Sequence, residues 1–298
     1  MLLLRAGRVV KPAPAVARRA ASTAAAPPAL EGGAEARLTP APSAGDGVWV
    51  LTLARPAARN AIGRAMLADV QRALAGLAAA PPAAARALVL ASGVPGVFCA
   101  GADLRERAGM TPAEALAFVT ALRASFRAVA ALPMPVFAAV EGAALGGGLE
   151  LALAADARVA GGDATFGLPE TGLGIVPGAG GLARLPAAVG FPLAAELVYT
   201  GRRLTAPDAA AARLVGRVTP PGGALAEVLA LAGAAAANAP LAVRAAKAAL
   251  SAARESGGGE AAGYAAEAAA YDAVLGTADR LEGLAAFREK RKPVYHGR

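Results

Sequence analysis

The chain has 298 residues, of which 56% are hydrophobic, and its formal net charge is +8. It contains one cysteine, Cys99, and one histidine, His296, near the C-terminus. These counts exclude an intrachain disulfide, a cysteine- or histidine-based metal cluster and a Ser-His-Asp triad built from internal residues. We therefore expect no metal site, a packing role for Cys99, and acid–base chemistry, if any, on carboxylates, lysines or tyrosines.

The first 45 residues have the composition of an appendage. Residues 1–30 hold five basic residues and no acidic one, and without them the net charge falls from +8 to +3. This imbalance predicts a mitochondrial transit peptide rather than a nucleic-acid-binding face, and a chloroplast address of similar composition is the alternative. Residues 24–45, rich in Ala, Pro and Gly, predict a disordered linker. No apolar stretch along the chain predicts a membrane span.

From residue 46 onward, strand-like and helix-like segments alternate. The expected strands are 48–53, 87–91, 136–140 and 157–160, and the expected helices are 63–80, 111–132 and 147–154. Residues from 187 onward are predicted to be almost wholly helical, with a turn at 257–259. Strands with crossover helices followed by a helical end predict an α/β domain over 46–240 and a helical region over 241–298.

Two of these helices carry specific markers. Residues 63–80 place four apolar side chains at a spacing of three to four residues: Met66, Val70, Leu74 and Leu77. Thr111, followed by Pro112 and Glu114, has the pattern of a capping box that opens a helix.

Two glutamates lie twenty residues apart in a segment dominated by glycine and apolar residues. Glu150 follows three consecutive glycines, and Glu170 follows Pro169. A carboxylate among apolar neighbours is costly unless it is paired or used, so a pair of them indicates acid–base chemistry in one site. Gly147 is expected at the start of a helix, where free N–H groups and the helix dipole favour an anion. The segment therefore predicts two acid–base groups beside an anion-binding backbone.

Four motifs in this order resemble those of the enoyl-CoA hydratase/isomerase (crotonase) family. They are Arg55-Pro56 with Asn60-Ala61, the run Phe98-Cys99-Ala100-Gly101-Ala102-Asp103-Leu104, the run Gly146-Gly147-Gly148-Leu149-Glu150 with Pro169-Glu170, and the closing runs 279–283 and 287–293. The resemblance extends from about residue 46 to the end of the chain. It implies a crotonase-like spiral of β-β-α units with a C-terminal helical region, 241–298, that makes trimer contacts.

The resemblance also implies how the protein would add water to an acyl-CoA thioester. Ala102 and Gly147 would supply two backbone N–H donors to the thioester oxygen, which needs such donors when it takes up enolate-like charge. Glu150 would orient and deprotonate a water, and Glu170 would deliver the proton to the α-carbon. Close like charges push one carboxyl pKa upward, so one protonated and one ionised carboxyl are expected. The residues alone leave open which glutamate has which role.

Coenzyme A enters only as part of the substrate, and no separate cofactor is expected. The resemblance assigns backbone contacts with its adenine and pantetheine to Asn60, Ala61, Ala100, Ala102 and Asp103. Arg59 is a candidate phosphate partner, with a solvated surface arginine as the alternative. Lys290 and the basic residues after it are candidates for the phosphates of a neighbouring subunit in a homotrimer or hexamer, with a solvated tail as the alternative.

The predicted function is hydration of a 2-enoyl-CoA thioester in the mitochondrial matrix. Within the family, the resemblance is closest to enzymes that hydrate 3-methylglutaconyl-CoA in leucine degradation. Isomerisation of the double bond and thioester hydrolysis are the alternatives. RNA binding, linked in some relatives to a lysine-rich first helix, is disfavoured because the helix 63–80 has only Arg64 and Arg72 as basic residues.

Overall fold

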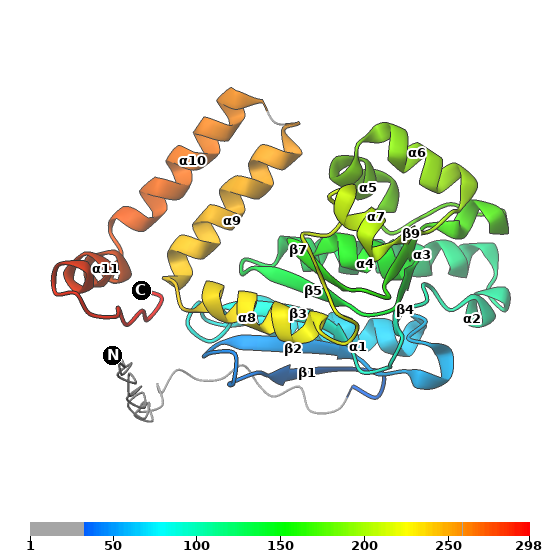
Figure 1. The fold of residues 1–298 in the computed structure, drawn as a ribbon, viewed down its shortest axis with the longest axis horizontal. Helices are drawn as coiled ribbons and strands as arrows, with labels where there is room; N and C mark the ends of the chain where they lie inside the picture. Colours follow the sequence, from blue (N-terminus) through cyan, green and yellow to red (C-terminus); the bar gives the residue numbers. More distant parts are fainter. Residues whose placement is uncertain (1–32, 258) are drawn as a thin grey trace, which may run out of the picture.

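The computed structural model describes residues 33–257 and 259–298. The predicted transit peptide lies outside these residues. The described chain forms two β-sheets with helices packed around them, followed by a helical C-terminal region that extends to one side (Figure 1).

The larger sheet has six strands, and the smaller sheet has four. The order of the larger sheet is β1 (Ala36–Pro40), β2 (Val48–Leu53), β3 (Ala87–Ser92), β5 (Val136–Val140), β7 (Ala157–Gly161) and β10 (Arg217–Thr219). The order of the smaller sheet is β4 (Val97–Cys99), β6 (Ala143–Leu145), β8 (Thr165–Gly167) and β9 (Leu204–Thr205). The pairs β1–β2 and β8–β9 are antiparallel, and the other pairs are parallel.

From β3 to β8, consecutive strands alternate between the two sheets, and helical segments follow each such pair. β3 and β4, then β5 and β6, then β7 and β8 repeat this step, which is the predicted spiral of β-β-α units. Parallel strands buried on both faces read as near-continuous apolar runs. In β3, Leu88 and Leu90 enter the larger core, and Ala87 and Val89 enter a smaller core beneath helix α8 (Ala224–Ala236).

The helices that surround the sheets agree closely with the predicted segments. The helix predicted over 111–132 is α3 (Pro112–Ala131), and Thr111 and Glu114 form the predicted capping box. The remaining helices of the main body are α1 (Arg64–Ala79), α2 (Leu104–Ala108), α4 (Gly147–Ala154), α5 (Gly181–Val189), α6 (Phe191–Thr200) and α7 (Ala206–Ala211), with short 3-10 helices η1 (Pro56–Ala58) and η2 (Pro169–Leu173).

The prediction of a disordered linker over 24–45 is wrong for residues 36–40. Residues 36–40 form β1, which pairs along its full length with β2. Ala36 and Leu38 are buried in the core, and the Asp69 carboxylate accepts hydrogen bonds from the backbone N–H groups of Glu35 and Ala36 at 2.9 and 3.2 Å. Five residues bounded by glycines and prolines give too short an alternation to be recognised as a strand.

The prediction that the chain is almost wholly helical from residue 187 is also too simple. The two-residue strand β9 pairs with β8, and the three-residue strand β10 extends the larger sheet beside β7. Strands this short form because a neighbouring strand pairs with them, so their own residues give little indication of a strand in the sequence.

The C-terminal region begins with two long helices, α9 (Pro240–Glu255) and α10 (Glu260–Leu275), which form an antiparallel hairpin beside the main body (Figure 1). Lys247 of α9 anchors the hairpin, because its Nζ donates to the Met134 carbonyl at 2.9 Å and pairs with Asp156 at 2.8 Å. The last helix, α11 (Ala278–Arg288), follows. Among the described residues no single helix has the length and apolarity to cross a membrane, and the one pair that meets these criteria together, α8 with α9, is bent by 110°.

Helix α4 lies at the centre of the fold, and all eight of its residues are buried. Gly148 allows this close packing, because a Cβ built on it would lie 2.2 Å from the Cys99 carbonyl oxygen of β4. The neighbour is backbone on a buried strand, so it has little freedom to move away.

Replacing Gly148 with alanine is therefore expected to lower the free energy of unfolding by about 1–3 kcal/mol or more, the usual cost of overpacking a core. Gly263 of α10 has open space at its Cβ position and serves as the control. Gly263→Ala should leave stability unchanged or raise it, since alanine favours helix. Denaturant unfolding of the two variants measures both effects, and equal stability would contradict the packing described for Gly148.

Candidate active site

Glu150 projects from α4 into the interior and is held by backbone amides. Its side chain is only 2% exposed. Glu150 Oε1 accepts hydrogen bonds from the N–H groups of Ala179 and Gly181, both at 2.8 Å. Burial raises the pKa of Glu150, and these two hydrogen bonds and the charges of Arg184 and Arg123 oppose the rise. The net pKa of Glu150 stays above its ordinary value, but these hydrogen bonds and charges limit the rise by stabilising the ionised form.

Glu170 lies in η2, directly after β8, and is 9% exposed. Its Oε2 is buried without a hydrogen-bond partner in the described structure. Burial, with the nearby charge of Glu150 adding to it, raises the pKa of Glu170 from 4.5 to about 7. The two carboxyl groups therefore differ in environment: amides solvate Glu150, and Glu170 has an oxygen available to carry a proton.

The raised pKa of Glu170 predicts a pH dependence of stability. A carboxyl group whose pKa is higher in the folded state contributes stability that is fully present below its ordinary value and is lost as the pH rises through the folded value. The stability of the wild type relative to Glu170→Gln should therefore decline between about pH 4.5 and about pH 7. Denaturant unfolding of both proteins across this range measures the difference, and a difference independent of pH would contradict the assignment.

Two backbone N–H groups lie close together beside the glutamates. Ile62 N–H donates to the Gly101 carbonyl at 2.7 Å, and Asp103 N–H donates to the Ile62 carbonyl at 2.9 Å, so the intervening Ala102 N–H points to the other side. That side faces the start of α4, where a Cβ built on Gly147 would lie 3.3 Å from Ala102 N. Gly147 N–H is in the first turn of α4, where the helix supplies no acceptor. The two amides can converge on one oxygen.

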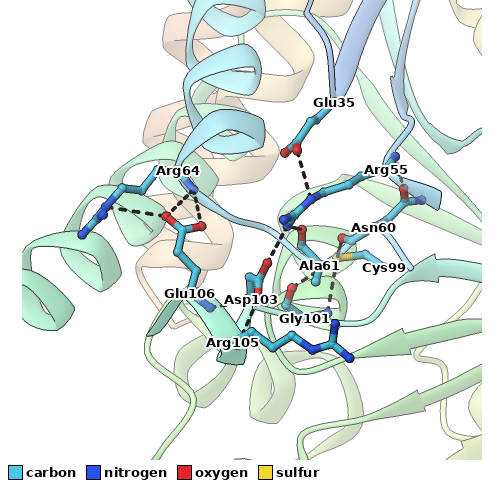
Figure 2. A network of polar contacts seen from close by, with 10 residues as sticks. All are labelled: Glu35, Arg55, Asn60, Ala61, Arg64, Cys99, Gly101, Asp103, Arg105 and Glu106. Atoms are coloured by element: carbon cyan, nitrogen blue, oxygen red, sulfur yellow. Dashed lines mark hydrogen bonds and ion pairs between the residues drawn. The ribbon is translucent and has the colours of Figure 1, made fainter. Parts of the chain in front are cut away.

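A polar network holds the loop that presents Ala102 (Figure 2). The Arg55 guanidinium donates to the Ala61 carbonyl and to Asp103 Oδ2, both at 2.7 Å, and pairs with Glu35 at 3.0 Å. Asp103 also caps α2 by accepting from the N–H groups of Arg105 and Glu106. Burial would raise the pKa of Asp103, but these hydrogen bonds and the Arg55 charge outweigh it and lower the pKa. Asp103 is thereby fixed as an anion.

Asn60 and Cys99 complete this support. Asn60 is fully buried, its side chain accepts from Arg55 N–H at 2.8 Å, and it donates to Ser92 Oγ and the Phe98 carbonyl at 2.8 and 3.0 Å. Cys99 Sγ lies 3.0 Å from the Asn60 carbonyl (Figure 2). Burial raises the pKa of the Cys99 thiol to about 12, which keeps it neutral.

The structure brings most of the predicted site residues together. The 59–61 and 100–103 segments run side by side, since Ala100 N–H donates to the Arg59 carbonyl at 3.1 Å. Arg59 and Ala100 are exposed, whereas the polar groups of Asn60 and Asp103 bond within the protein. Lys290 is not in this group, because it follows α11, which lies beyond the α9–α10 hairpin and away from α4 (Figure 1).

Three arginines near the glutamates did not stand out in the sequence. Arg107 of α2 lowers the pKa of Glu170 by its charge, and Arg123 of α3 and Arg184 of α5 act in the same way on Glu150. Arg107 and Arg123 lie in helical segments with other arginines, where a basic residue usually indicates a solvated surface. Only the fold shows that the charges of these three arginines act on the carboxyl groups.

The spiral of β-β-α units defines the crotonase class of fold, and it brings the two buried carboxyl groups near each other. The family model described as enoyl-CoA hydratase/isomerase matches residues 43–298. The chain belongs to the enoyl-CoA hydratase/isomerase family.

Known relatives agree with this assignment. The chain is 43% identical over 289 residues to human enoyl-CoA hydratase domain-containing protein 2, mitochondrial, with 96% of each chain covered. It is 42% identical over 255 residues to mouse methylglutaconyl-CoA hydratase, mitochondrial, covering 84% of this chain and 80% of that protein. The crystal structure of enoyl-CoA hydratase from Bacillus anthracis superposes with a TM-score of 0.84 at 40% identity, covering 89% of this chain and all of that one.

Proposed function

We propose that the protein hydrates 2-enoyl-CoA thioesters, with Glu150 and Glu170 as the catalytic pair. The observation that carries the proposal is the contrast between the two carboxyl groups. Glu150 accepts two amide hydrogen bonds and is suited to be the anion, and Glu170 has a pKa of about 7 and is suited to hold a proton near neutral pH. Hydration needs one group of each kind on the same side of the substrate.

In the proposed reaction, the thioester oxygen binds between the N–H groups of Ala102 and Gly147. Glu150 takes a proton from a water as its oxygen bonds to the β-carbon, and the electrons of the double bond move toward the thioester oxygen. The two amides stabilise this enolate-like charge in a water-poor site. Glu170 then gives its proton to the α-carbon. Before the next turnover the proton taken up by Glu150 passes to Glu170, so the net reaction adds one water and needs no separate cofactor. The edge formed by the 59–61 and 100–103 segments, where Arg59 and Ala100 are exposed, is the proposed binding surface for coenzyme A.

Hydration removes the conjugation between the double bond and the thioester, so ultraviolet absorbance measures it directly. Crotonyl-CoA mixed with the protein is expected to lose this absorbance at a rate proportional to protein concentration. A folded protein that leaves the band unchanged with both crotonyl-CoA and 3-methylglutaconyl-CoA would contradict the proposed function. Formation of a displaced double bond or of free coenzyme A would instead indicate the isomerase or hydrolase alternative.

For the acyl group, we propose a branched chain with a distal carboxylate, as in 3-methylglutaconyl-CoA. Arg107 supports this substrate. Its Nε is buried without a hydrogen-bond partner in the described structure, and its charge acts on Glu170. A guanidinium with an unused donor is suited to bind a carboxylate. A substrate without the second carboxylate would leave this donor unpaired, which is unfavourable.

Replacing Arg107 with glutamine is therefore expected to lower kcat/KM for 3-methylglutaconyl-CoA by about ten- to hundredfold relative to crotonyl-CoA, the range for a lost hydrogen bond to a charged group. Any effect of the substitution on Glu170 itself changes kcat/KM for both substrates, so it cancels in the ratio of the two kcat/KM values. Arg105→Gln, two residues earlier at an exposed position of α2, is the matched control. An unchanged ratio in Arg107→Gln would exclude this role for Arg107.

We also propose that the protein is a homotrimer or hexamer assembled through its C-terminal helices. Every residue of α10 is at least partly exposed, and the C-terminal region presents large apolar side chains to solvent, among them Leu250 at 74% and Phe287 at 85% exposure. Exposed apolar surface of this extent indicates a protein partner. Sedimentation equilibrium should give a trimer or a multiple of it, and a monomer would contradict the proposal.

We propose a mitochondrial location from two observations. The names of the human and mouse relatives include the word mitochondrial. The basic, acid-free composition of residues 1–30 is typical of a transit peptide. A fluorescent protein fused after residue 45 should accumulate in mitochondria. Accumulation in chloroplasts or retention in the cytosol would contradict the proposed location.

A further inference from the structure

We propose that Arg123 and Arg184 are positioning residues for Glu150. Their guanidinium groups donate hydrogen bonds to carbonyls of the 178–181 loop, and amides of the same loop donate to the Glu150 carboxylate. This inference rests on the proposed role of Glu150 as the base that activates water. It assigns a function to two arginines that lie outside the family motifs identified in the sequence.

The loop at the start of α5 binds Glu150 through its backbone amides. The N–H groups of Ala179 and Gly181 both donate to the same oxygen of Glu150, Oε1, at 2.8 Å. These amides can hold the carboxylate in one place only if the loop itself is fixed. Glycines at 178, 180 and 181 give the loop little rigidity of its own, so its position depends on other contacts.

Arg123 supplies the first of these contacts from α3. Its Nε donates to the Gly178 carbonyl at 2.7 Å. This carbonyl and the Ala179 N–H belong to the same peptide group. Arg123 therefore binds one end of a peptide whose other end binds Glu150. A positive donor on the carbonyl polarises the peptide and strengthens its N–H as a donor to the carboxylate.

Arg184 supplies the second contact from α5. Its Nη1 donates to the Ala179 carbonyl at 3.3 Å, and its Nη2 donates to the Phe126 carbonyl at 3.4 Å, so one guanidinium ties the loop to α3. Gly180, with φ +115°, leaves room for it, because a Cβ at this position would lie 2.2 Å from Arg184 Nη1. The loop is thus held from two sides, by Arg123 and by Arg184.

The charges around Glu150 give the two arginines a measurable effect. Burial raises the pKa of Glu150, and the amides of Gly181 and Ala179 and the charges of Arg184 and Arg123 lower it. Loss of either arginine removes a positive charge and loosens an amide, and both changes raise the pKa of Glu150. Within the described residues, the other charged groups that act on this region are Glu170 of η2, with Arg107 of α2 near it, and Arg127 of α3 and Arg254 of α9 near Arg184.

A base must be ionised, so kcat/KM falls at low pH as Glu150 takes up a proton. Arg123→Gln should shift this acidic limb to higher pH. On the limb, kcat/KM should be about two- to tenfold lower than in the wild type, the range for one hydrogen bond. On the plateau above it, the two proteins should agree more closely. Arg184→Gln should act in the same direction, and Arg123→Lys, which keeps the charge and a donor, should restore most of the wild-type profile.

Arg127→Gln is the matched control for net charge. Arg127 is one turn further along the exposed side of α3, and within the described residues it makes no hydrogen bond to the 178–181 loop. The acidic limb of the kcat/KM profile of Arg127→Gln should therefore coincide with that of the wild type. Equal shifts in Arg127→Gln and Arg123→Gln would show a general charge effect and overturn the inference, as would an unshifted limb in both Arg123→Gln and Arg184→Gln.

A second readout does not depend on activity. Glutamate labelled with carbon-13 at the carboxyl carbon reports the titration of Glu150 by NMR, and the resonance missing from Glu150→Gln assigns it. The Glu150 resonance should titrate at higher pH in Arg123→Gln than in the wild type. If it does so in a protein without hydratase activity, the positioning role stands and the proposed function fails. If hydratase activity is present and the titration is unchanged, the positioning role fails alone.

Discussion

Replacing Glu170 with glutamine is expected to lower kcat for enoyl-CoA hydration by about 10²–10⁴-fold, the usual contribution of a positioned acid or base. Glutamine has nearly the same shape, but its amide cannot give a proton to the α-carbon. Because Glu170 Oε2 is buried without a partner in the described structure, the substitution breaks no hydrogen bond at that atom. The loss should therefore appear in kcat with little change in stability at low pH.

Steady-state kinetics with crotonyl-CoA and circular dichroism of the purified variant measure activity and folding separately. Glu196→Gln is a matched control, since Glu196 lies on the exposed surface of α6 and pairs only with Arg202 among the described residues. The control should retain wild-type activity. A Glu170→Gln variant that is folded and hydrates crotonyl-CoA at the wild-type rate would show that Glu170 is not the proton donor.

Replacing Gly147 with alanine is expected to lower kcat/KM by about 10²–10³-fold, the effect of losing one donor of an oxyanion-binding pair. The added methyl group would lie 3.3 Å from Ala102 N, in the space where the thioester oxygen is proposed to bind. This separation between the methyl group and Ala102 N is short, but a small shift of the Ala102 backbone can accommodate it. We therefore expect the protein to fold and the oxygen to be displaced from one or both amides.

Gly172→Ala is the control for this substitution. Gly172 lies in η2, two residues after Glu170, and a Cβ there has no heavy atom within 4 Å. Its activity should match that of the wild type. If Gly147→Ala and Gly172→Ala hydrate the substrate equally well, the amides of Ala102 and Gly147 do not bind the thioester oxygen together.

Most of the fold was predictable because its strands and helices carry strong local patterns. The β5 sequence is a continuous apolar run, and α3 opens with a proline and a capping box, so both boundaries agree with the prediction. The class of fold followed from the order of the motifs. By contrast, β1, β9 and β10 have two to five residues each and exist because a longer strand lies beside them. A sequence pattern has no means of showing such dependence on a neighbour.

The candidate site was predictable to the extent that it is local. Glu150 and Gly147 share one helix, and the run of three glycines that includes Gly147 is unusual enough to be recognised. The supporting contacts join residues that are far apart in the chain: Arg55 with Asp103, and Arg123 with Gly178. Such pairs depend on how the elements pack, so only the structure shows them. The same is true of the difference in environment between Glu150 and Glu170.

The central claim is that water adds across the 2,3 double bond of an acyl-CoA. Incubating crotonyl-CoA with the protein in water labelled with oxygen-18, followed by mass spectrometry of the thioester, tests it most directly. The proposed mechanism predicts a 3-hydroxyacyl-CoA that carries the label on its β-carbon, in the wild type and not in Glu150→Gln. Recovery of unlabelled thioester with a moved double bond, or of free coenzyme A with a labelled acid, would contradict the claim.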